Sequence, residues 1–202
     1  MGRKKRVPRV MAAHSVGVRW ITLIYFCSGI CSLIDEVVWV RLLKLTLGNT
    51  VYASSIVISM FMGGLALGAL LMTRFADRVE RPLRLYALLE VCATFSALSL
   101  PIALRFADQG YRWFYTQAHP SPAGLLALQV IVSAVLLLVP AMVMGSTLPL
   151  LSRYVTAVHD RVGRLVGRLY ALNMLGATLG TFLAGFVLIR SVGVMGTLYI
   201  AA

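Results

Sequence analysis

The chain of 202 residues contains five apolar blocks that are each long enough to cross a lipid bilayer as a helix. A hydrocarbon core about 30 Å thick needs roughly 20 residues of α-helix, so blocks of this length predict transmembrane segments. The expected spans cover about residues 20–45, 51–72, 83–104, 124–151 and 165–189. Hydrophobic residues make up 59% of the chain, whereas soluble domains contain about 45–50%. We therefore predict an all-α membrane protein, a polytopic helical bundle without a soluble catalytic domain.

A sixth apolar block begins near Val194 and reaches the last residue of the chain, Ala202. A helix over this block is about 13 Å long, which is too short to cross a bilayer. The sequence thus predicts a basic tail at residues 1–19 and a transmembrane domain at 20–202. The domain is expected to hold five complete spans and a truncated sixth, at residues 194–202.

The net charge of +12 raises the question of nucleic-acid binding. The bases cluster at the ends of the apolar blocks, and no basic face with interleaved aromatic residues lies outside them, so we exclude a nucleic-acid partner. Lysine and arginine are concentrated on one side, which has 14 of them in the N-terminal tail and the 2–3 and 4–5 loops. The other side has 5. This bias predicts a multi-pass protein with a cytoplasmic N-terminus. Its longest extracytoplasmic loop is expected at residues 106–122.

Two carboxyl groups fall deep inside the first expected span. Only about 22 Å of helix separates Arg19 from Asp35, less than the hydrocarbon core requires, so the span must continue through Asp35 and Glu36. A charge at that depth costs about 2.5–3.5 kcal/mol on insertion scales, and such residues therefore face protein or water. Helical spacing predicts an inward stripe made of Tyr25, Ser28, Cys31, Ser32, Asp35 and Trp39.

Glu90 in the third span is a further acidic candidate, about 12 Å from the cytoplasmic end against about 22–24 Å for Asp35 and Glu36. One interpretation is a cation or proton site formed by Asp35, Glu36 and Glu90 in an internal cavity. The alternative is structural: the carboxyls pair with a Tyr, Asn, Arg or backbone group, or stay protonated and neutral. The sequence leaves both open.

Small residues mark two expected helix contacts, since they let helix backbones approach closely in lipid. Gly64 and Gly68 lie one turn apart in the second span, and Gly176 and Gly180 do so in the fifth. We predict helix packing at all four. Asn173 belongs to the same face as Gly176, where it is expected to hydrogen-bond across the contact or, alternatively, to bind a ligand.

The fourth span and the 2–3 loop carry helix-breaking and charged residues. Pro140 and Pro149 predict a kink or a broken turn, either as a packing feature or as a binding element. In the loop, Asp77 is expected to cap a helix or pair with an arginine, while Arg78 and Arg81 complete a solvated charged turn.

The chain shows no pattern for catalysis, metal binding or a cofactor. Cys27, Cys31 and Cys92 all lie in apolar spans without the histidine or acidic neighbours of a metal site. No nucleotide-binding glycine loop and no Ser/His/Asp set is present. We predict no catalytic residues, no metal ligands and no cofactor.

Short runs across residues 20–200 form a joint pattern: 28–29, 33–42, 47–53, 61–68, 85–90, 144–150, 167–173, 176, 180, 185–186 and 188–189. They include Leu33-Ile34-Asp35-Glu36-Val37 and Met144-Gly145-Ser146-Thr147-Leu148-Pro149-Leu150. Together they resemble the N-terminal membrane region of the fused major-facilitator-type/spermidine synthase-like (polyamine aminopropyltransferase-like) family. Asp77, Arg78 and Arg81 also resemble the major facilitator 2–3 turn, although Thr73 stands in place of its glycine.

In that family a soluble Rossmann-like domain follows the membrane region and transfers an aminopropyl group from decarboxylated S-adenosylmethionine to putrescine. The resemblance therefore implies a membrane module, major-facilitator-half-like, that anchors a downstream spermidine synthase-like domain and is not itself catalytic. It also implies a location in the cell inner (plasma) membrane and a polyamine ligand, bound or moved by the module. The alternatives are half of a secondary transporter of unknown substrate, or a ligand-free anchor and assembly module.

Overall fold

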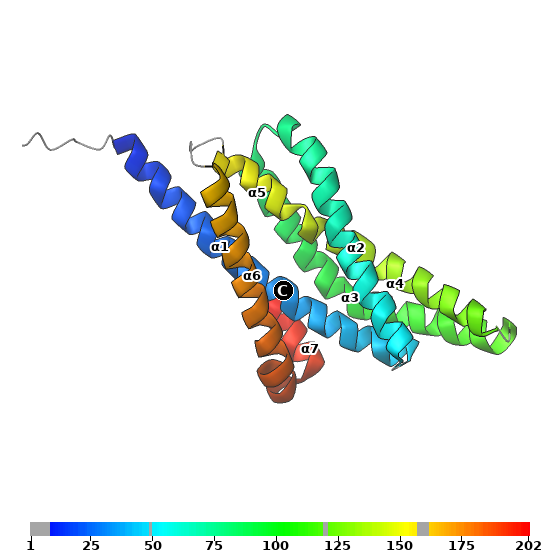
Figure 1. Ribbon diagram of the computed structural model, residues 1–202. Coiled ribbons are helices and arrows are strands. Elements are labelled where there is room, and N and C mark those ends of the chain that lie inside the picture. Colours follow the sequence, from blue (N-terminus) through cyan, green and yellow to red (C-terminus); the bar gives the residue numbers. More distant parts are fainter. Residues whose placement is uncertain (1–8, 49, 119–120, 157–161) are drawn as a thin grey trace, which may run out of the picture.

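The computed structural model describes residues 9–48, 50–118, 121–156 and 162–202, which are almost entirely helical and contain no strand (Figure 1). The elements are α1 (Arg9–Leu47), α2 (Val51–Phe75), the 3₁₀ turn η1 (Ala76–Arg78), α3 (Pro82–Ala118), α4 (Pro122–Gly145), α5 (Thr147–Thr156), α6 (Val162–Phe182), the π-helical η2 (Leu183–Leu188) and α7 (Ile189–Ala201). Five helical stretches are long and apolar enough to cross a membrane: Arg19–Leu47, Val51–Arg78, Pro82–Gln117, Pro122–Val155 and Gly163–Ala201. The prediction of an all-α chain with five spans of this kind is confirmed. Residues 1–8 of the predicted tail lie outside the described part.

The long loop predicted at residues 106–122 is wrong, because α3 continues through most of it to Ala118. The apolar block ends near Leu104, but the next proline after Pro101 is Pro120, so nothing in between forces the helix to stop. An ion pair one turn apart, from Arg112 Nε to Asp108 Oδ2 at 3.0 Å, lies on this extension. The extension adds about 20 Å of helix beyond the apolar block.

The fourth span is interrupted at Ser146, between the two prolines that predicted a break. α4 ends at Gly145 and α5 begins at Thr147, while Pro140 lies inside α4 and Pro149 falls in the first turn of α5. The Ser146 hydroxyl donates to the carbonyl of Met142 at 2.8 Å and lies 3.2 Å from the carbonyl of Gly68 in α2. The interruption is thus stabilised by hydrogen bonds, one of them to a neighbouring helix.

The fifth span contains two irregularities that the sequence pattern did not predict. Its helix widens to a π-helix at η2 and is then broken inside α7 at Gly193, where φ is 76° and ψ is 176°. Only glycine adopts this backbone conformation readily. The chain turns back there, so its C-terminal end lies beside the middle of α1 (Figure 1). Residues 194–201 form only about 12 Å of helix, and the described part of the chain contains no sixth helix of crossing length.

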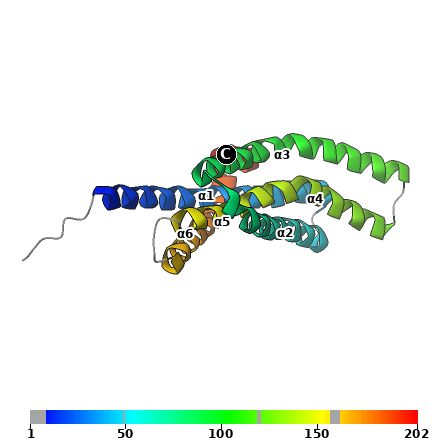
Figure 2. The ribbon, with the colours of Figure 1, turned by 90° about the horizontal axis from the view of Figure 1, so that it is seen from above.

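Two helix pairs pack with their backbones in close contact, α1 with α6 and α2 with α4. A Cβ atom added at Gly176 or Gly180 would collide with backbone carbonyls of α1. Gly64 and Gly68 face the backbone and side chains of α4 in the same way. Seen from above, α1 and α4 lie between α3 on one side and α2 and α6 on the other (Figure 2). The four glycines singled out in the sequence therefore lie at helix contacts.

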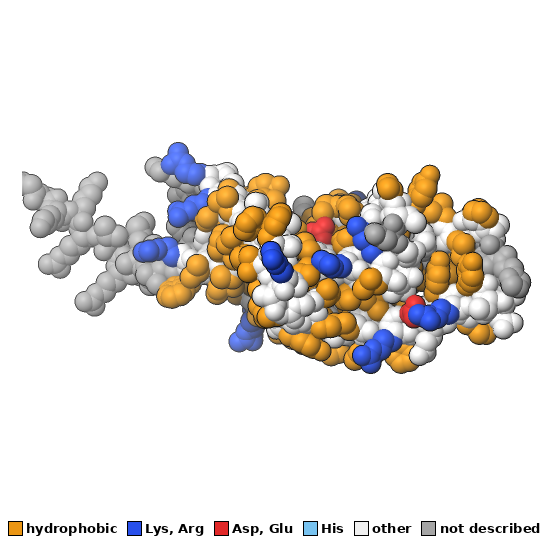
Figure 3. Space-filling model, turned by 90° about the horizontal axis from the view of Figure 1, so that it is seen from below, with side chains coloured by type: hydrophobic (Ala, Val, Ile, Leu, Met, Phe, Trp, Pro, Cys, Tyr) orange, Lys and Arg blue, Asp and Glu red, His pale blue; other side chains and the backbone are white. Residues whose placement is uncertain are grey.

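The buried core lies where the second half of α1 meets α2, α3 and α4. Trp39 and Phe61 pack edge to face there, with ring centroids 6.1 Å apart. By contrast, large apolar side chains cover much of the outer surface, as on the face in Figure 3. Apolar surfaces of this extent are typical of contact with lipid or another apolar partner rather than with water.

Candidate functional site

A cavity of about 520 Å³ lies between α1, α2, α6 and the junction of α4 with α5. We call it the central cavity. Much of its wall is apolar, from residues such as Phe61, Leu65 and Met144. Its polar side chains come mainly from α1 and α6: Tyr25, Ser28, Ser32, Glu36, Thr147, Tyr170, Asn173, Thr178 and Thr181. This mixture of an apolar wall with a few polar groups is typical of a ligand site.

Glu36 supplies the carboxyl group on the wall of the central cavity. Its Oε2 atom is buried and has no hydrogen-bond partner, and no ion pair involves it among the residues that the structure describes. Leaving a buried carboxylate uncompensated is costly, because water no longer solvates the charge. The site therefore favours either a proton on Glu36 or a cation beside it.

Glu90 does not line the central cavity but is connected to it through Ser28. The hydroxyl of Ser28, which lines the cavity, donates to Oε1 of Glu90 at 2.8 Å and so joins α1 to α3. Tyr86 lies one turn before Glu90 and packs edge to face on Tyr25, with ring centroids 6.4 Å apart. Ser28 and Glu36 are about 12 Å apart along α1. The two carboxyls thus lie at different depths and do not form one acidic cluster.

Asp35 is buried, with 4% of its surface exposed, but it does not line the central cavity. Its Oδ1 atom has no hydrogen-bond partner in the described part, and neither has the indole nitrogen of Trp39, one turn further along. The inward stripe predicted from the sequence therefore divides. Tyr25, Ser28 and Ser32 face the cavity together with Glu36, whereas Cys31, Asp35 and Trp39 do not line it.

Asn173 belongs both to the α1–α6 contact and to the cavity wall. Its Nδ2 atom donates to the backbone carbonyl of Tyr25 at 2.9 Å, and its backbone lies directly against Gly29. The hydrogen bond across the helices and the position in the cavity are therefore compatible. The same stripe of α6 includes Tyr170, Thr178 and Thr181. Their helical spacing is visible in the sequence, but the predicted site residues do not include them.

The charged 2–3 loop lies apart from the central cavity. Asp77 in η1 pairs with Arg153 of α5, with 3.6 Å between Oδ1 and Nη1, although 93% of the Asp77 side chain is exposed. The guanidinium of Arg78 lies 5.9 Å from the centre of the Phe75 ring. Arg81 is exposed just before α3. The ion pair thus connects the loop to α5, and the loop forms an exposed charged turn.

The donor set of the cavity suits an organic cation better than a metal ion. No group of three or more His, Cys, Asp or Glu side chains comes together within the described residues. Instead, one carboxylate is accompanied by hydroxyl groups and by the rings of Tyr25, Tyr170 and Phe61. Aromatic faces attract ammonium groups, and hydroxyls accept their hydrogen bonds.

Comparison of the chain with protein-family models, curated proteins and solved structures gives no match.

Proposed function

We propose that this chain is the multi-pass membrane module of a spermidine synthase-like protein and that its central cavity binds a polyamine cation. In this function the module lies in the inner membrane as a major-facilitator-like half with a cytoplasmic N-terminus. It holds a spermidine synthase-like domain at the bilayer surface. Five helices of crossing length and apolar outer surfaces support the membrane part. The resemblance of the sequence runs supports the family and the ligand class.

One observation carries the ligand part of the proposal: Glu36 lies on the wall of the half-open central cavity, and its buried Oε2 atom has no hydrogen-bond or ionic partner in the described part of the chain. A charge in this position costs about 2.5–3.5 kcal/mol. A cation 4 Å away returns about 4 kcal/mol at an effective dielectric constant near 20. The two terms are of similar size, so an ammonium group can make the ionised form of Glu36 stable in the cavity.

The shape of the site fits a ligand with more than one ammonium group. Glu36 lies at one level of α1, and the Ser28–Glu90 hydrogen bond lies about 12 Å away along the same helix. Tyr25 and Tyr170 line the wall near Ser28. A flexible polyamine places one ammonium beside Glu36 and another toward Ser28, with its methylene groups on the apolar wall. Asp35, which does not line the cavity, has a supporting role at most in this arrangement.

The test is spermidine binding to the purified full chain in detergent, measured by calorimetry. We expect Glu36→Gln to weaken binding at least tenfold, which corresponds to about 1.4 kcal/mol. Glu80→Gln is the matched control, because it makes the same change at an exposed acid outside the central cavity. Glu90→Gln is expected to have a smaller effect than Glu36→Gln, since Glu90 acts through Ser28.

Two results would reject the ligand part. Equal affinity in the wild type and Glu36→Gln would remove the acid from the site, and no binding by the wild type would favour a ligand-free anchor. Uptake of radiolabelled spermidine or putrescine into vesicles then separates binding from movement. Uptake that Asp35→Asn, Glu36→Gln and Glu90→Gln all leave unchanged would show that the acids do not act in transport.

A further inference from the structure

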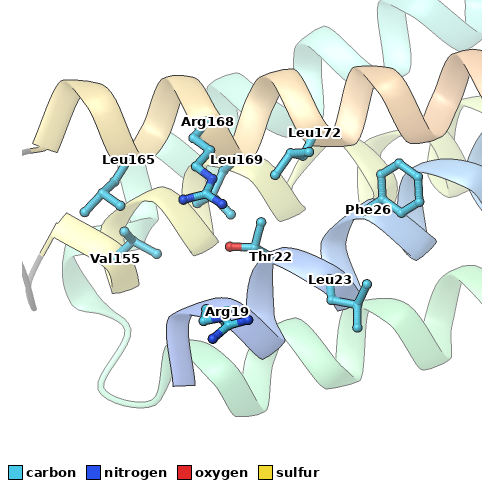
Figure 4. A pocket seen from close by; sticks show the side chains of 9 residues that line it. All are labelled: Arg19, Thr22, Leu23, Phe26, Val155, Leu165, Arg168, Leu169 and Leu172. Atoms are coloured by element: carbon cyan, nitrogen blue, oxygen red, sulfur yellow. The ribbon is translucent and has the colours of Figure 1, made fainter. Parts of the chain in front are cut away.

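A second hollow, of about 330 Å³, opens between α1, α5 and α6, and we call it the arginine crevice. Arg19 and Arg168 line it from opposite helices (Figure 4). Arg168 reaches from α6 into the space between the helices, and Arg19 bounds the same space from α1. The rest of the wall is nearly all apolar: Thr22, Leu23, Phe26, Val155, Leu165, Leu169 and Leu172.

The two arginines bring positive charge to the crevice that the described residues do not neutralise. The ion pairs in this part of the chain join Arg112 to Asp108 and Arg153 to Asp77, and neither involves Arg19 or Arg168. Both side chains are exposed, and two guanidinium groups that line one space give it a positive charge that suits an anion. Guanidinium groups bind phosphate oxygens well, because their planar donors make two parallel hydrogen bonds.

The position of the crevice along the helices corresponds to a membrane surface. Arg19 begins the first stretch that is apolar enough to cross a membrane, and Arg168 lies near the start of the last one. Arg19 is about 26 Å along α1 from Glu36. The apolar side chains Leu23, Phe26 and Leu172 continue from the arginines toward the middle of the helices. A charged end thus leads directly into an apolar wall.

We propose that the arginine crevice binds the phosphate headgroup of an anionic phospholipid, with an acyl chain on the apolar wall. Phosphate chemistry alone would also fit a soluble phosphate. The adjoining apolar surface, with Leu23 50% exposed, favours the lipid, because a soluble anion leaves that surface uncovered. Basic pockets between transmembrane helices are known to bind anionic headgroups. This inference depends on the membrane location in the proposed function and is independent of the cation site.

The experiment is native mass spectrometry of the full chain in detergent, titrated separately with phosphatidylglycerol, phosphatidylcholine and inorganic phosphate. We expect phosphatidylglycerol to bind at least tenfold more tightly than phosphatidylcholine, and inorganic phosphate not to compete with it at millimolar concentration. The double variant Arg19→Gln/Arg168→Gln is expected to lose at least tenfold in phosphatidylglycerol affinity. The matched control Arg41→Gln/Arg190→Gln removes two exposed arginines from α1 and α7 outside the crevice and is expected to change nothing.

Several outcomes would overturn the lipid site. These are an unchanged phosphatidylglycerol affinity in the crevice variant, an equal loss in the control, or displacement of the lipid by inorganic phosphate. Arg19→Lys/Arg168→Lys keeps both charges, so binding that survives there and fails in the glutamine variant supports the site even if the latter is less stable. Spermidine binding by the crevice variant, expected to be intact, separates this site from the proposed function.

Discussion

The central cavity and the arginine crevice lie along the same two helices, α1 and α6, but their walls carry opposite charge. The acidic wall residue of the cavity is Glu36, whereas the crevice has the basic residues Arg19 and Arg168. Where the two helices meet, Gly29, Gly176 and Gly180 let the backbones approach so closely that a side chain at any of these positions would collide with the facing helix. The same packing device therefore supports both hollows. The ligand chemistry of each comes from the polar stripe beside the contact and not from the contact itself.

The largest expected effect comes from breaking the contact that both hollows share. Gly180→Ala adds a Cβ atom that would collide with the backbone carbonyl of Ile30. Overpacking of this kind costs about 1–3 kcal/mol. We expect a lower midpoint of thermal aggregation in detergent, with loss of both spermidine and phosphatidylglycerol binding.

Gly167→Ala is the matched control on the same helix, because a Cβ there meets no atom within 4 Å. Alanine is favoured over glycine in a helix by up to about 1 kcal/mol. This variant is therefore expected to keep or raise the midpoint. Equal midpoints for the two variants would mean that the α1–α6 backbones are not in contact.

The next effect separates the two hollows by their ligands. A ligand that binds only the folded state stabilises it by about 2.7 kcal/mol at a concentration of 100 Kd. We expect Glu36→Gln to lose thermal stabilisation by spermidine and keep that by phosphatidylglycerol. Arg19→Gln/Arg168→Gln is expected to show the reverse. If each variant loses both effects, the two hollows act as one site, and the contrast in charge has no functional meaning.

A smaller effect is expected at Asn173, where the shared contact meets the central cavity. Asn173→Ala removes the hydrogen bond to the Tyr25 carbonyl, and such bonds between transmembrane helices contribute about 0.6 kcal/mol on average. We expect a slightly lower melting midpoint and weaker spermidine binding, with phosphatidylglycerol binding unchanged. Thr178→Val is the control, since the Thr178 hydroxyl also lines the cavity but bonds within its own helix, to Met174. An equal loss of spermidine binding in both variants would assign the effect to cavity polarity in general.

The comparison of the hollows also shows which features a single sequence can predict. Five spans followed from length and hydropathy, and the glycine positions at 64, 68, 176 and 180 followed from small residues at helical spacing. The sequence did not predict which carboxyl group faces the cavity, because Asp35 and Glu36 differ by only about 100° of rotation around the helix. Contacts with neighbouring helices fix that rotation, and they place Glu36 on the cavity wall.

Other structural features could not be predicted, because the sequence has no pattern for them or has one with more than one interpretation. The extension of α3 to Ala118 lacks the apolar pattern of a span, and the π-helical turn η2 has no sequence signature that distinguishes it from the surrounding helix. In the sequence, Arg19 and Arg168 indicate only the orientation of the chain in the membrane. The pairing of these two arginines across one crevice depends on which helices are neighbours, and that information is absent from the linear sequence.

The smallest expected effect concerns the 2–3 loop, which lines neither hollow and is connected to the arginine crevice only through α5. Asp77 pairs with Arg153 of α5, and Val155 of the same helix forms part of the crevice wall. Because Asp77 is almost fully exposed, water and salt screen the pair strongly. We expect Asp77→Asn to leave the melting midpoint and spermidine binding unchanged and to weaken phosphatidylglycerol binding slightly at most, at low salt. The measurement is lipid affinity at low and high ionic strength, with Asp108→Asn as the control for an exposed ion pair away from the crevice. A large loss in Asp77→Asn would mean that the loop positions α5, and the crevice would then depend on the loop as well as on the α1–α6 contact.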